Sequence, residues 1–199
     1  MEQIISKEEF NNLMKIKGEV RGRGIREPMN FVFEREGENG LKKIEDTMIK
    51  LGFPLKYQEI KENNLYPIKL LAITLLVMKR LFDYDDKNFQ DMGKMGAKLS
   101  MLVRIFMKYF VSLKKIVTTI PEYWRKYYTI GEARLIEFDE KKRYIILRIE
   151  NFPYFPAHCD ILKGYFSGVV QMVVKSQVFC KEIKCPRMGD KYHEFIVEW

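Results

Sequence analysis

The first half of the chain carries hydrophobic residues at the three- and four-residue spacing of amphipathic helices. The densest run, from Pro67 to about Phe82, is apolar on its flanks as well as on its inner stripe. This helix is therefore expected to be buried on more than one side. Other helices are predicted over residues 6–15, 41–51, 85–110 and 121–128, with a shorter one from residue 112. Phe31 and Phe33 alternate as in a strand over residues 29–36.

The pattern changes near residue 132 to the two-residue period of β-strands. Strands are predicted over residues 132–138 and 143–150, then a helix over residues 157–174, then a closing hairpin over residues 178–185 and 192–199. Gly164 and Gly168 are four residues apart, a spacing that favours a close approach between this helix and the sheet.

The register of the closing hairpin follows from its apolar residues. One register puts both apolar faces on the same side of the sheet, which favours it over a register shifted by one residue. The expected partners are Cys185 with His193, Ile183 with Phe195, and Phe179 with Trp199.

These elements predict an α+β fold, with a helical N-terminal half followed by an antiparallel sheet (β-β-α-β-β) and helices packed on one face. The chain has 199 residues, 47% of them hydrophobic, enough to bury a sizeable core. We expect residues 1–199 to form a single domain, because no internal repeat or linker is visible.

The formal charge of +8 is concentrated in the middle of the chain. Residues 61–130 hold 13 basic and 6 acidic side chains, which could form a face that meets nucleic acid or another acidic partner. The lysines are scattered, however, as on a solvated helical face. This scatter favours the solvated helical face, so nucleic acid is not the expected partner.

The cysteines and the N-terminus predict a cytoplasmic protein. The three cysteines, Cys159, Cys180 and Cys185, are too few for a disulfide scaffold. The N-terminal residues lack the basic and apolar regions of a signal peptide. The longest apolar stretch, residues 70–78, is too short to span a membrane.

Aromatic residues suggest a site for a hydrophobic or planar ligand. Trp124, Tyr127 and Tyr128 gather beside Pro121, where they could stack on a ligand or form a seam between a helix and the sheet. The candidate ligand-binding residues are Phe106, Trp124, Tyr128, His158, Tyr165 and His193.

Cys185 and His193 are the candidate metal ligands. A thiolate and an imidazole opposite each other on a hairpin could hold two positions of a zinc ion, with His158 and Cys159 as possible further ligands. The alternative is a small buried thiol that packs beside a hydrogen-bonded histidine.

No residue pattern indicates an enzyme. Glu182 has the wrong parity to share a strand face with Cys185 and His193, which argues against a nucleophilic triad. Gly22 and Gly24 lie in a basic, glycine-rich stretch, but no apolar helix is expected after them, as a phosphate-binding loop requires. No dinucleotide-binding fingerprint is present.

The C-terminal string Glu182, Cys185, Gly189, Asp190, His193 and Phe195 resembles the signature of 4-vinyl reductase domains. Residues 164–168 resemble the aromatic and glycine-containing helix of the same family, and the likeness covers roughly residues 90–199. His193 stands where that family usually has a second cysteine.

The resemblance implies membership of the superfamily that groups 4-vinyl reductase domains, haem-based nitric-oxide sensors and Golgi-transport tethering subunits. Its members share an α+β fold with an enclosed apolar cavity, and most bind ligands or partners. The haem sensors need a Tyr-x-Ser-x-Arg string that this chain lacks, so haem is disfavoured and zinc is left as the possible cofactor.

The sequence therefore predicts a non-enzymatic binding or sensor module that encloses a hydrophobic or planar small molecule. One alternative is a protein-interaction subunit resembling the Golgi-transport branch, which would form a homodimer through an apolar helix surface. A nucleic-acid binder with a basic surface is the other.

Overall fold

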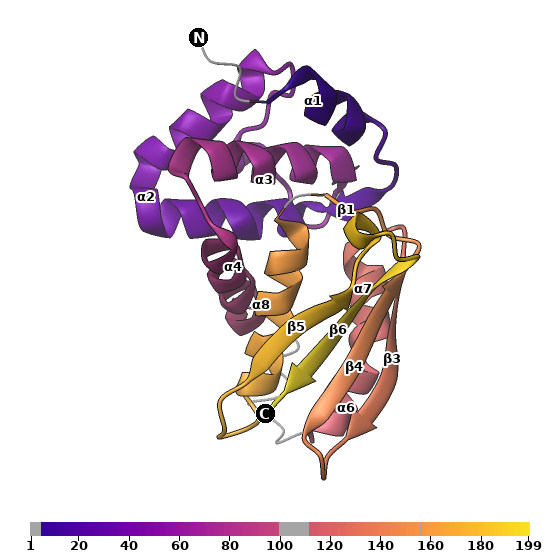
Figure 1. Ribbon diagram of the computed structural model, residues 1–199. Helices are drawn as coiled ribbons and strands as arrows, with labels where there is room; N and C mark the ends of the chain where they lie inside the picture. Colours follow the sequence, from indigo (N-terminus) through magenta and orange to yellow (C-terminus); the bar gives the residue numbers. More distant parts are fainter. Residues whose placement is uncertain (1–4, 100–111, 156) are drawn as a thin grey trace.

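The computed structural model describes residues 5–99, 112–155 and 157–199, and its helices and strands form the α+β arrangement shown in Figure 1. The elements of the first half are α1 (Lys7–Met14), β1 (Glu19–Arg21), α2 (Gly22–Lys50), the 3-10 helix η1 (Tyr57–Glu59), β2 (Leu65–Pro67), α3 (Ile68–Phe82) and α4 (Asp86–Leu99). The elements of the second half are α6 (Leu113–Thr118), α7 (Ile120–Tyr127), β3 (Glu132–Asp139), β4 (Tyr144–Glu150), α8 (His158–Gln171), β5 (Phe179–Lys184), the 3-10 helix η2 (Pro186–Met188) and β6 (Tyr192–Glu198).

Several predicted elements are confirmed by their local chemistry. The side chain of Ser6 accepts a hydrogen bond from the Glu9 N–H, and the Glu9 carboxylate accepts one from the Ser6 N–H, which completes the capping box of α1. Helix α3 is buried on most of its circumference, as its dense apolar pattern predicts.

The predicted strand over residues 29–36 was wrong, because these residues lie in α2. Its buried residues Ile25, Met29 and Val32 follow helical spacing, whereas Phe33 is 45% exposed. The alternation of Phe31 and Phe33 was therefore a chance match to the two-residue period. A non-helical residue, Gly37, divides α2 with φ 67°.

The absence of a helix after the glycine-rich stretch was also a wrong expectation, since α2 begins at Gly22. Backbone carbonyl groups of the chain itself bond the first N–H groups of this helix. The N–H groups of Gly22 and Arg23 donate to the carbonyl oxygens of Asn64 and Glu62 at 2.8 and 3.0 Å. A Cβ atom on Gly22 would lie 2.2 Å from the Lys61 carbonyl oxygen, so the glycine allows the backbone to approach closely.

The main sheet is antiparallel, with strand order β3-β4-β6-β5, and β1 pairs with β2 in a separate two-stranded sheet. The inner face of the main sheet is apolar. Helix α8 packs against β5 and β6, and α7 packs against β3 (Figure 1). The apolar core residues of this face are Ile145, Leu147, Ile149, Phe195 and Val197. The predicted α+β class with helices on one sheet face is confirmed.

The predicted register of the closing hairpin was off by one residue. Strand β5 pairs Phe179 with Glu198 and Glu182 with Phe195, and a bulge lies between Glu182 and Lys184. Phe179 is consequently 61% exposed instead of buried. A bulge of this kind inserts an extra residue and changes the side to which the following residues point. Cys185 lies beyond the bulge and is buried.

The glycines of α8 allow a close approach to α4 rather than to the sheet. A Cβ atom on Gly164 would lie 1.9 Å from the Gln90 carbonyl oxygen, and one on Gly93 would lie 2.0 Å from the Ile161 carbonyl oxygen. The two helix backbones are therefore nearly in contact. None of the described helices is long and apolar enough to cross a membrane.

Candidate functional site

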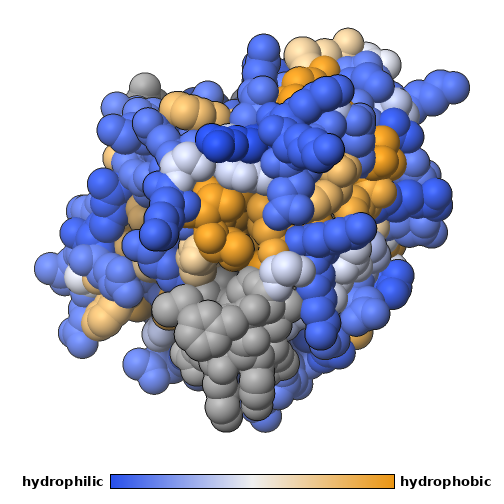
Figure 2. Space-filling view, turned by 90° about the horizontal axis from the view of Figure 1, so that it is seen from below, coloured by the Kyte–Doolittle hydropathy of each residue, from blue (hydrophilic) through white to orange (hydrophobic). Residues whose placement is uncertain are grey.

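An apolar cavity of about 110 Å³ lies between α2, α3, α4, α7 and α8. Its wall is rich in aromatic rings. Those rings belong to Tyr123, Trp124, Tyr127, Tyr128, Tyr165 and Phe166. Gly24 of α2 and Gly93 and Gly96 of α4 complete parts of the wall. In the space-filling view from below, Figure 2 shows hydrophobic residues gathered in a hollow framed by hydrophilic ones.

Rings from the α7 end, the β4–α8 loop and α8 pack together beside the cavity. The rings of Trp124 and Tyr128 lie 4.5 Å apart, and Phe152 packs edge-on against both. The Trp124 Nε1–H donates to the Ile130 carbonyl oxygen at 3.0 Å, which fixes the indole in place. Trp124 therefore both lines the cavity and joins α7 to the loops next to β3 and β4, so the two interpretations of this aromatic group are compatible.

His158 lies at the first turn of α8 and is buried in the cavity wall. Its Nε2 atom is 2.9 Å from the Tyr128 hydroxyl oxygen. Burial, with a smaller contribution from the nearby His193, lowers the pKa of His158 to about 3. The imidazole is consequently neutral at physiological pH.

Glu27 is the one carboxylate in the described part of the cavity wall. Its Oε1 atom accepts a hydrogen bond from Arg23 Nε at 3.0 Å and lies 3.5 Å from the Tyr127 hydroxyl. Burial raises the pKa of Glu27, although Arg23 partly offsets this effect. The place of Glu27 in the cavity wall could not be predicted from the sequence, because residue spacing does not show that α2 reaches the cavity.

A second cluster lies between α8 and the inner face of the sheet. Cys159, Glu182, Cys185 and His193 each offer one possible metal-ligand atom, and these atoms lie within 4.8 Å of one another. The Nδ1 atom of His193 is 2.8 Å from Glu182 Oε1 and 3.6 Å from Cys159 Sγ. Burial, together with the Glu182 charge, raises the pKa of the Cys159 and Cys185 thiols.

The structure corrects the expected role of Glu182. Its parity was predicted to exclude it from the face of Cys185 and His193, but the true register turns its carboxylate toward the imidazole. Cys159 comes to the cluster from the first turn of α8. His158, the other residue considered as a further metal ligand, lies outside the cluster and bonds Tyr128 instead.

The predicted ligand-binding residues separate into three groups. Trp124, Tyr128, His158 and Tyr165 line the cavity. His193 belongs to the thiol–imidazole cluster and is not part of the cavity lining. Phe106 lies outside the described residues.

Comparison with known proteins gives a fold but no sequence family. No family model matches the chain, and no curated protein matches it. An H-NOX protein from Shewanella oneidensis, solved in the Fe(II)NO ligation state, matches with a TM-score of 0.66 and 14% identity, over 89% of this chain and 98% of that one. A structure described under "Modulating Heme Redox Potential Through Protein-Induced Porphyrin Distortion" matches with a TM-score of 0.62 and 12% identity, over 90% of this chain and 99% of that one.

A trafficking protein particle complex subunit 3 from Naegleria fowleri, covalently bound to palmitic acid, also matches. Its identity is 22% and its TM-score 0.47, over 65% of this chain and 92% of that one. The H-NOX structures are similar over nearly the whole chain, so the chain shares their α+β fold.

The sequence-based view of the cofactor was wrong. It set haem aside because one short string was missing and left zinc as the possible cofactor. Domains that share this fold at TM-scores above 0.6 include H-NOX proteins studied for their haem. Since identity to them is below 15%, a missing string is not a criterion for excluding haem.

Proposed function

We propose that this chain is a ligand-binding domain that encloses an apolar or planar small molecule in the cavity between α2, α4, α7 and α8. The observation that supports the proposal is the cavity itself, which has a volume of about 110 Å³ and a wall made mostly of aromatic and aliphatic side chains. An engineered apolar cavity of about 150 Å³ stays dry and binds benzene. The cavity of this chain is thus suited to a ligand with a single ring.

The expected affinity of such a ligand is modest. One aromatic ring of side-chain size removes roughly 150–200 Å² from water. At about 25 cal/mol per Å², this burial favours binding by about 4–5 kcal/mol before the cost of association. Because the cost of association lowers this value, we expect single-ring probes to bind with dissociation constants of roughly a millimolar or above.

The structural similarity to H-NOX proteins makes haem one candidate ligand of the cavity. In the described wall, His158 supplies one buried and neutral imidazole, the form that ligates iron. Ligation would replace its bond to the Tyr128 hydroxyl, and a porphyrin would need the surrounding helices to move apart. A hemin titration decides this point. A Soret band that changes in His158→Gln assigns haem to the cavity, and an unchanged spectrum of free hemin leaves the cavity to smaller molecules.

The proposal for the cavity is tested by filling it. Among the described residues, a Cβ atom on Gly96 would have one close neighbour, Glu27 Oε2 at 3.4 Å, so a larger side chain there extends into the cavity. Gly96→Leu should abolish the binding of toluene and benzyl alcohol in a calorimetric titration. Lys98→Leu places the same side chain on the exposed side of the same helix and should leave binding unchanged. Equal binding to both variants would reject the cavity as the site.

We also propose that Cys159, Glu182, Cys185 and His193 bind a divalent metal ion. Two thiols, an imidazole and a carboxylate are the donors of tetrahedral sites in proteins, and the four atoms lie close enough to share one ion. The His193 Nε2 atom is buried and has no hydrogen-bond partner among the described residues. Three of the four residues belong to the string that resembles 4-vinyl reductase domains, which supports kinship with that family.

A further inference from the structure

The position of Glu27 in an otherwise uncharged cavity indicates which chemical group the ligand carries. Among the residues of the described wall, Glu27 is the one acidic residue, and no lysine or arginine lines the cavity there. Its side chain is 18% exposed, against 33% for its helix neighbour Arg23. In an ordinary exposed pair of this i, i+4 type, both side chains extend into solvent. Here the acid lies deeper than the base.

The two carboxylate oxygens of Glu27 have different surroundings. Arg23 Nε and the Tyr127 hydroxyl both contact Oε1. The other oxygen, Oε2, lies beside Gly96 and has no hydrogen-bond partner among the described residues. Gly96 lines the cavity and has no side chain that could cover this oxygen. Arg23 thus holds the carboxylate in place, and no described residue bonds Oε2.

The rings of the wall favour a cation near this carboxylate. Trp124, Tyr127 and Tyr165 line the same cavity, and the faces of aromatic rings attract positive charge. Aromatic walls with a nearby carboxylate recognise ammonium groups, whereas an anion would meet both the ring faces and Glu27 with repulsion. A neutral donor could bond Oε2 but would gain less, since charge-assisted hydrogen bonds are about twice as strong.

We propose that the cavity binds an organic amine in its protonated form, with the ammonium group hydrogen-bonded to Glu27 Oε2 and the apolar body packed among the aromatic rings. This inference rests on the proposed function, since it names the class of ligand for that cavity.

Four single-ring probes of similar size test it: benzylamine, benzyl alcohol, toluene and benzoate. Benzylamine, which is protonated at neutral pH, should bind about tenfold or more tightly than benzyl alcohol and toluene. Benzoate should not bind measurably. Equal affinity for benzylamine and toluene, or binding of benzoate, would overturn the inference while leaving the cavity as a binding site. Failure of all four probes to bind would reject the proposed function, and the inference with it.

Variants assign the preference to Glu27. In Glu27→Gln, which keeps the shape and an acceptor oxygen, the affinity for benzylamine should fall to that for benzyl alcohol, with toluene binding unchanged. Glu34→Gln removes a charge from an exposed position on the same helix and should keep the preference. An amine preference that survives in Glu27→Gln contradicts the assignment. The comparison of probes on the wild-type protein needs no variant, so it stands even where Glu27→Gln folds poorly.

Discussion

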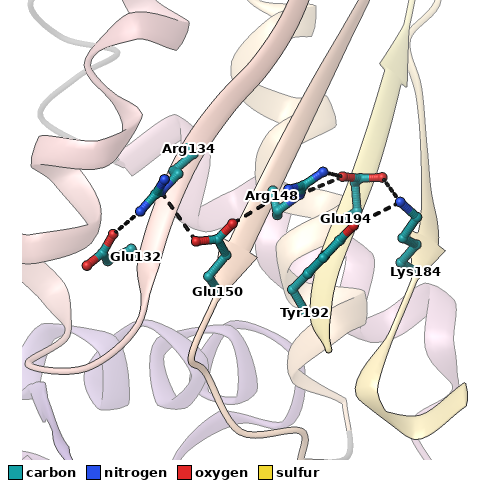
Figure 3. Close-up of polar contacts among 7 residues, drawn as sticks. All are labelled: Glu132, Arg134, Arg148, Glu150, Lys184, Tyr192 and Glu194. Carbon is teal, nitrogen blue, oxygen red and sulfur yellow. Dashed lines mark hydrogen bonds and ion pairs between the residues drawn. The ribbon is translucent and has the colours of Figure 1, made fainter. Parts of the chain in front are cut away.

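The two faces of the main sheet treat their charged groups differently. On the outer face, acids and bases alternate in a row across all four strands (Figure 3). Its ion pairs, in order, are Glu132–Arg134 at 2.7 Å, Arg134–Glu150 at 3.4 Å, Glu150–Arg148 at 3.6 Å, Arg148–Glu194 at 2.7 Å and Glu194–Lys184 at 3.0 Å. On the inner face, Glu182 contacts an imidazole, with two thiols close by.

The outer charges pair with one another and hold the strands together, whereas the inner groups are available to bind a ligand. Each outer carboxylate of the row has a guanidinium or ammonium partner, so the row is neutralised by the protein itself. The inner cluster brings together four groups that can donate electron pairs, and no described lysine or arginine forms an ion pair with Glu182. Buried thiol, imidazole and carboxylate donors gathered at one point are the pattern expected for a metal site.

The largest expected effect is the loss of metal binding at the inner cluster. Cobalt(II) added to the reduced wild-type protein should give thiolate charge-transfer absorption and the visible bands of a tetrahedral ion. Cys185→Ser should weaken this binding by at least about a hundredfold, since it removes a direct ligand. The matched control is Cys180→Ser, a nearby thiol outside the cluster. Equal loss in the two variants, or no thiolate absorption in the wild type, would contradict the site.

A smaller effect is expected at the centre of the outer row. The Glu194 side chain is only 6% exposed and bonds both Arg148 and Lys184. Glu194→Gln should lower the free energy of unfolding by about 1–3 kcal/mol, because two cations lose their partner. Urea denaturation measures this value. An unchanged midpoint would show that the row contributes no stability at its most buried point.

The contribution of Glu194 to the free energy of unfolding should depend on pH, and the sign of this dependence follows from its pKa. Burial raises the pKa of Glu194, but the hydrogen bonds and charges of Lys184 and Arg148 outweigh it and hold the pKa below its usual value. The ionised group therefore stabilises the fold above the unfolded-state pKa of about 4.3, and this stability is lost as the pH falls through the folded-state pKa. The stability difference between wild type and Glu194→Gln should be constant from about pH 6 to 8 and shrink below about pH 4. A difference that grows on acidification contradicts this sign.

The smallest effect is expected at the exposed end of the row. Arg134 bridges Glu132 and Glu150, but its side chain is 55% exposed. Exposed ion pairs contribute little because water screens them. Arg134→Ala should change Tm by less than about 2 °C in a calorimetric scan. A change as large as that of Glu194→Gln would mean that the row acts as one cooperative network.

The sequence predicted the second half of the fold better than the first. The strands and α8 were predicted from residue 132 onward because alternation and polar turns mark them clearly. In α2, the alternating Phe31 and Phe33 suggested a strand, and only the helical spacing of Ile25, Met29 and Val32 shows the true period. The bulge in β5 has no mark in its residue types, which is why the register was misjudged by one position.

The sequence predicted only some of the residues of the candidate site. Trp124 and His158 could be proposed because aromatic residues and histidines are residue types that commonly line ligand sites. Glu27 could not, since its place in the wall depends on α2 meeting α4, α7 and α8, which are distant in the chain. Glu182 was excluded by a parity argument that holds only for a regular strand.

The most direct test of the proposed ligand cavity uses the two tryptophans of the chain. Trp124 lines the cavity, whereas Trp199 packs beside Phe138 and is not part of the cavity wall. After labelling with 5-fluorotryptophan, the fluorine NMR spectrum should show one resonance that shifts saturably with toluene, and Trp124→Phe should identify it. The Trp199 resonance should stay in place. A Trp124 resonance that does not move, or equal shifts of both resonances, would contradict a ligand site in this cavity.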